Sequence, residues 1–392
     1  MIELKGKRNT AILFTDAVDK TAKTQIAALL REEAYADAKI RIMPDVHAGK
    51  DVAVGTTMTL NGRLSPALVG SDIGCGMEVV YLQEREIDLS MLDTVIHRTV
   101  PCGARVHETP QESFQLDELY CKQKIHRQRA LCSLGTLGGG NHFIEIDRFR
   151  HGGLVLVIHS GSRQLGSDVA AYYREQAYRY QCKKQGKRHK QLAREEDTDL
   201  YGEDIRIRTK HNAPKVKRET AVLEGELFAQ YCHDVAITTA FADSNRRIIA
   251  DRICQAMSLT VTDRFSCVHN TIDASYGILR KGAVSARLGE RVIIPLNMRD
   301  GAVFGRGLGN PDWNFSAPHG TGRVYNRTDA KYAFTVEEFQ KEMTGIYTST
   351  ANEGSLDECP MAYKPPERIL RFLAETVEIE EIAKPIYNFK SC

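Results

Sequence analysis

Short β-like segments that end in glycine-rich turns dominate this chain, and one long helical stretch interrupts them. Within residues 131–162, the segments FIEID and LVLVIHS have the apolar and β-branched content of buried strands, and glycine-rich turns flank them. Strand-and-turn patterning also fills residues 1–100 and returns from about 267 to 327. This alternation predicts an α+β fold with a mixed β-sheet core and glycine-rich loops at the strand ends, where functional residues usually gather.

The helical part of the pattern lies mainly in residues 166–256, which we interpret as an insertion on the β scaffold. Two helical segments there flank a charged stretch, residues 194–218. A further helix is expected within residues 15–34, with Thr15 or Asp16 as its N-cap.

Composition is that of an ordinary globular protein: the 392 residues are 42% hydrophobic and 27% charged. With no repeat or linker, residues 1–392 are predicted to form a single domain, in which residues 335–384 are mainly helical. The net charge of +2 means that a nucleic-acid partner must be held by a local basic face. The run KKQGKRHK, residues 183–190, is interpreted as a solvated helix end, with phosphate contacts for some of its lysines as the alternative.

Targeting and redox signals point to one compartment. No apolar run is long enough to span a bilayer, and the charged N-terminus lacks a secretion signal, so we expect a cytoplasmic protein with no membrane partner. The 10 cysteines contain no C-x-x-C pair and are expected to be thiols.

The stretch GSDIGCGM, residues 70–77, places Asp72 three residues before Cys75, which lies between two glycines. A carboxylate and a thiolate in one loop can bind a divalent metal, whereas the alternative is a tight turn with an inert, buried cysteine. The set is extended by three histidines in strand-end loops, His142, His159 and His269.

Five ligands exceed one tetrahedral site but fit two ions if the Cys75 thiolate bridges them. The flanking glycines would then leave room for the sulfur to be reached from two sides. Ligand type alone favours zinc, while manganese tolerates more ligands and open positions. Paired ions suit phosphoryl chemistry, because each can hold one oxygen of an in-line displacement.

A second constellation is NFSAPHGTGR, residues 314–323, in which His319 lies between Pro318 and Gly320. Neutral imidazole is a competent nucleophile near pH 7, and the glycines could admit phosphates to backbone N–H groups. The alternative is a simple turn histidine. The segment HSGSRQLG adds Arg163, whose guanidinium is suited to clamping a phosphate.

Together these segments resemble the RtcB family of RNA-splicing ligases. The resemblance rests on eight motifs that occur in order along the chain: MPDVHAGK (43–50), GSDIGCGM (70–77), GTLGGGNHFIE (135–145), HSGSR (159–163), HN (269–270), KGAVSAR (281–287), APHGTGR (317–323) and PMAYK (360–364). Eight ordered matches are far more specific than any one of them.

The resemblance implies a GTP- and Mn²⁺-dependent ligase of tRNA splicing or RNA repair. Such an enzyme joins RNA with a 2′,3′-cyclic phosphate or 3′-phosphate end to RNA with a 5′-hydroxyl end, through a histidine–GMP intermediate and an RNA 3′ end activated with GMP. His319 would be the nucleophile. One manganese would be held by Asp72, Cys75 and His142, and the second by Cys75, His159 and His269. A monomer is expected, and residues 166–256 are the surface expected for any helper protein.

The resemblance also implies a nucleotide pocket in which Glu145 reads the guanine edge. The implied pocket residues are Asn141, His142, Phe143, Ile144, Glu145, His269, Asn270, Pro295, Leu296, Asn297, Met298, Ala302, His319, Gly320, Thr321, Gly322, Tyr363 and Lys390. The residues implied for the RNA phosphate path are Arg163, His47 and Lys50, the last two within Asp45–Lys50.

The chain departs from the family pattern at PLNMRDG, residues 295–301. Many members have a PGSMG turn here, whose backbone and serine hold GTP phosphates. Leu296 and Asn297 replace the glycine and the serine, and Ala302 stands where a further serine is usual. We expect Asn297 to donate to a phosphate oxygen in their place.

Two other functions remain as alternatives from the residues. A dinuclear metal phosphoesterase would use the same ions on an RNA end without a covalent nucleotide. A non-catalytic RNA-end binding protein would form a stable, GTP-independent complex without turnover. A nucleotide adduct on the purified protein would distinguish the ligase from both.

Overall fold

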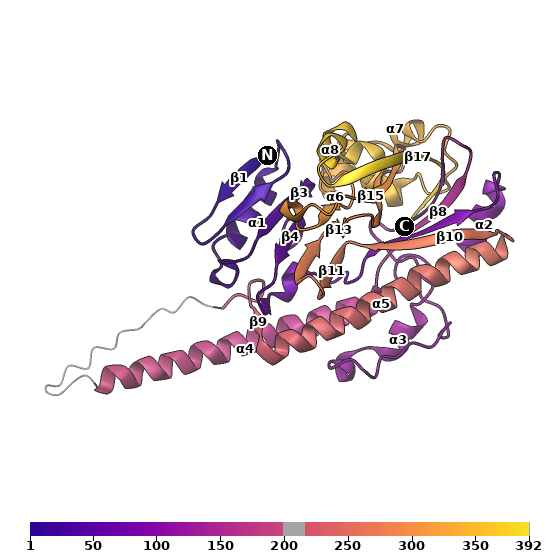
Figure 1. The fold of residues 1–392 in the computed structure, drawn as a ribbon. Helices are drawn as coiled ribbons and strands as arrows, with labels where there is room; N and C mark the ends of the chain where they lie inside the picture. The colour runs from indigo at the N-terminus through magenta and orange to yellow at the C-terminus, as the bar shows by residue number, and fades with distance from the viewer. Residues whose placement is uncertain (199–215, 392) are drawn as a thin grey trace.

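The computed structural model describes residues 1–198 and 216–391, and it confirms the predicted α+β class (Figure 1). Its larger sheet has seven strands, and every neighbouring pair is antiparallel. In spatial order the strands are β10 (Val261–Val268), β6 (Gly76–Leu82), β8 (Leu154–Ser160), β7 (Phe143–Arg148), β17 (Val377–Lys390), β15 (Gly301–Gly307) and β14 (Arg291–Asn297). The sheet is curled, because its two edge strands meet where Arg291 of β14 donates to the carbonyl of Arg264 in β10, at 2.8 Å.

The second sheet has six strands and is mixed, since β2 and β3 pair in parallel and the other pairs are antiparallel. Its order is β1 (Ile2–Lys5), β2 (Thr10–Leu13), β3 (Ile40–His47), β4 (Val54–Thr59), β12 (Ile278–Lys281) and β11 (Asn270–Asp273). Two short ribbons complete the strands: β13 (Ala283–Ser285) with β16 (Ser316–Pro318), and β5 (Arg63–Leu64) with β9 (Leu223–Glu224).

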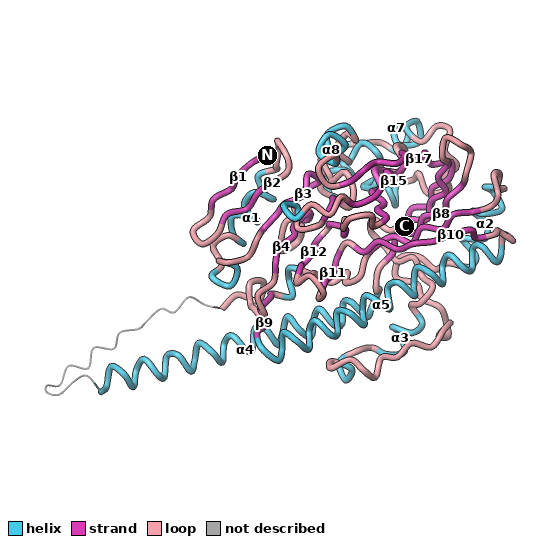
Figure 2. Tube along the Cα trace, in the orientation of Figure 1, coloured by secondary structure: helices cyan, strands magenta, loops and turns pink. Residues whose placement is uncertain are grey.

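Two long helices, α4 (Arg163–Thr198) and α5 (Gly225–Ala256), run side by side beneath the sheets, and the far end of α4 projects away from them (Figures 1 and 2). They occupy the predicted helical insertion, residues 166–256. Most of the charged stretch 194–218 lies outside the described residues. No helix in the described ranges is long and apolar enough to cross a membrane.

The remaining helices are short. They are α1 (Lys20–Leu29), α2 (Leu89–Thr99), α3 (Arg127–Cys132), α6 (Arg327–Ala333), α7 (Val336–Glu342) and α8 (Glu367–Leu373), with 3₁₀ turns at Glu33–Tyr35, Pro66–Leu68, Lys122–Lys124, Pro311–Trp313, Glu353–Glu358 and Pro360–Ala362. Helix α2 lies in a region predicted to hold only one early helix. It begins after Asp88, whose carboxylate accepts from the backbone N–H groups of Ser90 and Met91.

The predicted N-cap of the first helix is wrong. Helix α1 begins at Lys20, and its cap is Asp19, whose side chain accepts from Ala22 N at 2.7 Å. Thr15 and Asp16 are engaged elsewhere: the Thr15 hydroxyl donates to Ala17 O, and Asp16 pairs with an arginine of α8. The helix therefore starts after Asp19, whose carboxylate is available to accept from a backbone N–H of the first turn.

The C-terminal prediction is wrong in its last part, because residues 377–384 begin the long strand β17 instead of continuing a helix. The segment VEIEEIAK is rich in good helix formers. Pairing decides against that preference: β17 fills the gap between β7 and β15 and hydrogen-bonds to both. Its buried residues Val377 and Ala383 join the core inside the curled sheet.

The two faces of the curled sheet carry different cores. Val79 and Val157 point into the curl with Phe304, whereas Val80 and Leu156 pack on the outer face. The outer core includes Ile249 and Ile253 of α5, together with residues of α2. Burial of these apolar faces holds α5 against strands β6 and β8, directly beneath the loops described next.

Candidate metal centre and adjoining cavity

The five predicted metal ligands converge at one end of the curled sheet. Cys75 precedes β6, His142 precedes β7, and His159 lies near the end of β8. The ladder places Met77 and Phe143 opposite His159 on its two sides. His269 follows β10, the other neighbour of β6, and its backbone N–H donates to Cys75 O at 2.9 Å.

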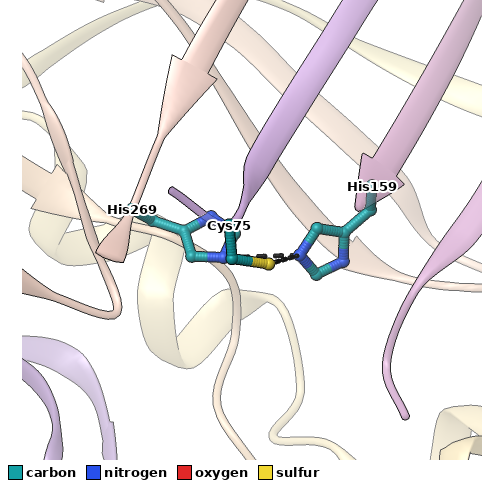
Figure 3. Close-up of side chains that lie close together, drawn as sticks. All are labelled: Cys75, His159 and His269. Carbon is teal, nitrogen blue, oxygen red and sulfur yellow. Dashed lines mark hydrogen bonds between the residues drawn. The ribbon is translucent and has the colours of Figure 1, made fainter. Parts of the chain in front are cut away.

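The donor atoms form two groups that share one sulfur. Cys75, His159 and His269 form one group, shown in Figure 3, and Asp72, Cys75 and His142 form the other; within each, the ligand atoms lie within 4.8 Å of one another. Cys75 Sγ lies 3.2 Å from His159 Nε2 and 3.4 Å from His142 Nε2. His142 Nε2 lies 3.4 Å from Asp72 Oδ2, and the Nε2 atoms of His159 and His269 are 3.3 Å apart.

Backbone carbonyls orient two of the imidazoles. His142 Nδ1 lies 2.8 Å from Leu137 O, and His159 Nδ1 lies 3.1 Å from Asn141 O. A carbonyl can only accept, so each Nδ1 carries the proton and each Nε2 directs a lone pair at Cys75. Neutral imidazoles held in this way by an outer hydrogen bond are the usual form of metal-ligating histidine.

Burial keeps two histidines of the candidate metal centre neutral, which is the form that binds a cation. It lowers the pKa of His159 and His269 well below the usual range, so both rings are neutral. Burial, with the charge of Asp72, raises the pKa of the Cys75 thiol, and a bound divalent ion would favour the thiolate instead. Among the described residues, the buried His269 Nδ1 has no hydrogen-bond partner. A set of carboxylate, thiolate and imidazole donors fits divalent transition-metal ions.

The glycines beside Cys75 have a different purpose from the one that the sequence suggested. Gly74 has a φ of +74°, and a Cβ there would lie 2.8 Å from the Cα of Thr239 in α5. A Cβ on Gly76 would lie 2.2 Å from the carbonyl oxygen of Cys267 in β10. They allow a helix and a strand to pack directly on the cysteine loop, instead of leaving free space around the sulfur.

Two adjacent residues of α5, Asn245 and Arg246, connect the ligand-bearing loops. Both side chains are fully buried. Arg246 Nη1 donates to the carbonyls of Gly74 and Ser160, at 2.8 Å each, and these residues adjoin the ligands Cys75 and His159. Asn245 donates to Ser160 Oγ at 3.0 Å, and that hydroxyl donates to Leu137 O, the carbonyl that orients His142. Two consecutive residues of α5 therefore fix the positions of the loops that carry Cys75, His142 and His159 relative to one another.

His319 follows β16 and lies beside the metal ligands, with its ring centroid 4.9 Å from that of His269. Its Nδ1 is 2.7 Å from Oδ2 of Asp45, which is fully buried and also accepts from the His319 backbone N–H. Since the carboxylate holds Nδ1–H, Nε2 is left with its lone pair. Gly322 permits this turn, because a Cβ there would lie 2.0 Å from Asp45 O.

A cavity of about 700 Å³ adjoins His319 and the metal centre. Most of the predicted nucleotide residues line it: Asn141, Phe143, Glu145, Leu296, Asn297, Met298, His319, Gly320, Thr321, Gly322, Tyr363 and Lys390, together with His47, Lys50 and His159. Six predicted residues do not line it, namely His142 and His269 of the metal centre, and Ile144, Asn270, Pro295 and Ala302. Of these, Ile144 and Ala302 are core residues of the curled sheet.

Arg163, the remaining residue predicted for the RNA path, begins α4 with a left-handed φ of +55°. Its guanidinium covers Gly138, where a Cβ would lie 1.9 Å from Arg163 Cζ. Nη2 donates to Gly103 O at 3.3 Å, whereas the buried Nε finds no acceptor in the part of the chain that the structure describes. A strained arginine with an unused buried donor fits a site that receives an anion.

Asn297 is engaged within its own turn. Its Oδ1 accepts from the N–H groups of Arg299 and Asp300, at 2.9 Å each, and its Nδ2 donates to Asp300 Oδ2 at 2.7 Å. One amide hydrogen remains for a ligand in the cavity that Asn297 lines. The side chain therefore shapes the β14–β15 turn as well as the cavity wall.

Sequence reasoning missed a carboxylate that organises the far wall of the cavity. Glu358 is buried and pairs with Arg323 at 3.0 Å, Arg327 at 2.7 Å and Lys390 at 3.0 Å, and it accepts from the Tyr363 hydroxyl. No motif marks it, because its three cationic partners lie more than 30 residues away in the chain. Asp45 was expected near the RNA path, and its contact with His319 required the fold.

Comparison with known proteins places the chain among RNA-joining enzymes. A sequence model of the family described as "tRNA-splicing ligase RtcB" matches residues 27–123 and 111–391, and the chain belongs to this family. It is 30% identical to the RNA-splicing ligase RtcB of Escherichia coli K12 over 382 residues, covering 87% of each chain. It is 25% identical to the tRNA-splicing ligase RtcB of Aeropyrum pernix, covering 84% of this chain and 82% of the relative. The resemblance seen in the motifs is thereby confirmed.

Proposed function

We propose that this protein is a GTP-dependent RNA ligase that joins 3′-phosphate or 2′,3′-cyclic phosphate ends to 5′-hydroxyl ends, in tRNA splicing or RNA repair. One observation carries the proposal. His319, held by Asp45 through Nδ1, lies in the wall of the cavity and beside His269 of the metal centre. A nucleophile, a candidate metal centre and a nucleotide-sized cavity thus adjoin one another.

In the first step, His319 Nε2 attacks the α-phosphorus of GTP. A P–N bond forms, and the bond to the leaving pyrophosphate breaks. Asp45 keeps the proton on Nδ1 and stabilises the positive charge that develops on the ring. Two manganese ions, held by Asp72–Cys75–His142 and Cys75–His159–His269, would supply neutralisation of the phosphate charge.

In the second step, an oxygen of the RNA 3′-phosphate attacks the phosphorus of the bound GMP, and the P–N bond breaks to return neutral His319. A cyclic phosphate must first be opened by water to reach this stage. In the third step the 5′-hydroxyl attacks the activated 3′-phosphorus, loses its proton and displaces GMP. Lys50 and Arg323, which line the cavity, and Arg163, whose guanidinium covers Gly138, are assigned to the RNA phosphates.

The proposal is tested by incubating the protein with Mn²⁺ and GTP labelled at the α-phosphate, and then adding RNA with a 3′-phosphate and a 5′-hydroxyl end. We expect an acid-labile, alkali-stable adduct on His319 that transfers to RNA. His319→Ala should lose the adduct but still join RNA whose 3′ end already carries GMP. His151→Ala, a change at an exposed histidine, is the matched control and should behave like the parent.

An adduct on a residue other than His319 would contradict the mechanism. End hydrolysis without any adduct would favour the metal phosphoesterase instead. A stable RNA complex that forms without GTP and never turns over would favour the end-binding protein.

A further inference from the structure

Strand β7 carries two buried carboxyl groups on one face. Glu145 and Asp147 are two residues apart, so their side chains point to the same side of the sheet. Glu145 lines the cavity, whereas Asp147 lies deeper along the strand and does not line it. Their residues are 2% and 0% exposed, respectively. Unpaired buried carboxylates are rare, so this pair needs a reason.

The two carboxyls have different partners. Glu145 accepts a hydrogen bond from the side-chain amide of Asn388 in β17. The positive charge of Lys390 also stabilises the ionised form of Glu145. Neither oxygen of Asp147 has a hydrogen-bond donor among the described residues, and the polar group nearest to it along the same face of β7 is the Glu145 carboxyl. On the other side β8 offers only Val155 and Val157 opposite the pair.

Two adjacent buried carboxyls cannot both ionise at moderate cost, so the pair retains a proton. Lys384 acts on Asp147 only through space. Burial raises the pKa of both groups, that of Glu145 to about 7 and that of Asp147 well above its usual range. The proton therefore remains on Asp147, because the charge is better accommodated on Glu145, beside Asn388 and Lys390.

We propose that Asp147 is a specificity-determining residue for the nucleotide base: as a neutral acid it donates to Glu145 and keeps Glu145 an ionised acceptor. The inference rests on the proposed GTP site. Guanine offers two adjacent donors, N1–H and the exocyclic amine, which match a carboxylate. Adenine offers one donor and one acceptor, which match a protonated carboxyl. By keeping Glu145 ionised, the protonated Asp147 thus favours guanine over adenine without contacting the base itself.

The test measures binding of GDP and ADP to the full chain by equilibrium dialysis between pH 5.5 and 8.5. In the parent, the preference for GDP should fall as the pH drops through the range in which Glu145 gains a proton. Asp147→Leu removes the donor, so the fall should move upward by ~1 pH unit, with ~10-fold less GDP preference at pH 7. Asp147→Asn should retain the parent profile, because its amide N–H donates in place of the acid.

Asp263→Asn, on the exposed side of β10, is the control and should leave the profile unchanged. A parent-like profile for Asp147→Leu would overturn the inference. So would a downward shift for Asp147→Asn, because that shift means that Asp147 is the ionised member of the pair. The assay needs no RNA and no covalent step, so loss of joining with an intact binding profile would overturn only the proposed ligase function.

Discussion

Replacement of Arg246 by methionine should be among the most damaging single changes in the helical part of the protein. The guanidinium is fully buried in α5, and its Nη1 is the donor for the carbonyls of Gly74 and Ser160. Methionine has similar length but no donor, so both carbonyls would lose this partner inside the protein. Its ion-pair partner Asp243 is half exposed and can be hydrated, so we assign it no cost.

The magnitude follows from those two carbonyls. A buried polar group left without a partner costs about 1–3 kcal/mol, so the loss of both contacts in Arg246→Met should lower the free energy of unfolding by about 2–6 kcal/mol. The change also frees the loops that hold Cys75 and His159, and loss of such outer contacts typically weakens metal binding by about 10–100-fold.

Urea denaturation followed by circular dichroism, in the presence of a chelator, measures the first effect. Titration with Co²⁺, followed through its thiolate charge-transfer band, measures the second. Arg247→Met is the matched control, because the neighbouring arginine is exposed and its replacement should change stability by less than about 0.5 kcal/mol. A loss below about 1 kcal/mol together with parent-like Co²⁺ affinity would refute the clamp role of Arg246.

Three further outcomes are expected. Cys75→Ala should remove the ligand shared by both groups of donors and abolish both GMP adduct formation and RNA joining; measured Mn²⁺ content should fall for both ions, and near-normal joining would exclude a bridging thiolate. Asn297→Ala should raise the GTP concentration needed for adduct formation more than it slows joining from a preformed adduct, because it loosens the turn and removes an amide from the cavity wall; parent-like behaviour at limiting GTP would assign the phosphates to other residues. Burial raises the pKa of Glu78 from its usual 4.5 to about 7, so the folded state binds more protons than the unfolded state between these values, and stability falls as the pH rises through that window. When the pH rises from 4.5 to 7.5, the free energy of unfolding should therefore fall by roughly 1–3 kcal/mol less in Glu78→Gln than in the parent, as measured by thermal or urea unfolding. Equal decreases in the two proteins would show that Glu78 titrates normally.

The amino-acid sequence predicted the candidate site, because each proposed ligand lies in a short local motif. Asp72 and Cys75 occur in one glycine-rich loop, and the three histidines were predicted to lie in loops at strand ends. Placement of donors at strand ends is a local property that hydrophobic patterning reveals. The sequence could not show why Gly74 and Gly76 are needed, since the atoms that exclude a side chain there belong to α5 and β10.

Long-range pairing decided the rest. By itself, the sequence determined the α+β class and singled out the candidate ligands and His319, because these depend on residue type and near neighbours. Only the tertiary structure turned VEIEEIAK into a strand, since hydrogen bonds to β7 and β15 outweigh a helix preference of a few tenths of a kcal/mol per residue. It also brought Asp45 to His319, across 274 residues of chain. Contacts of this kind depend on how the sheets and α5 pack, and no local pattern encodes that packing.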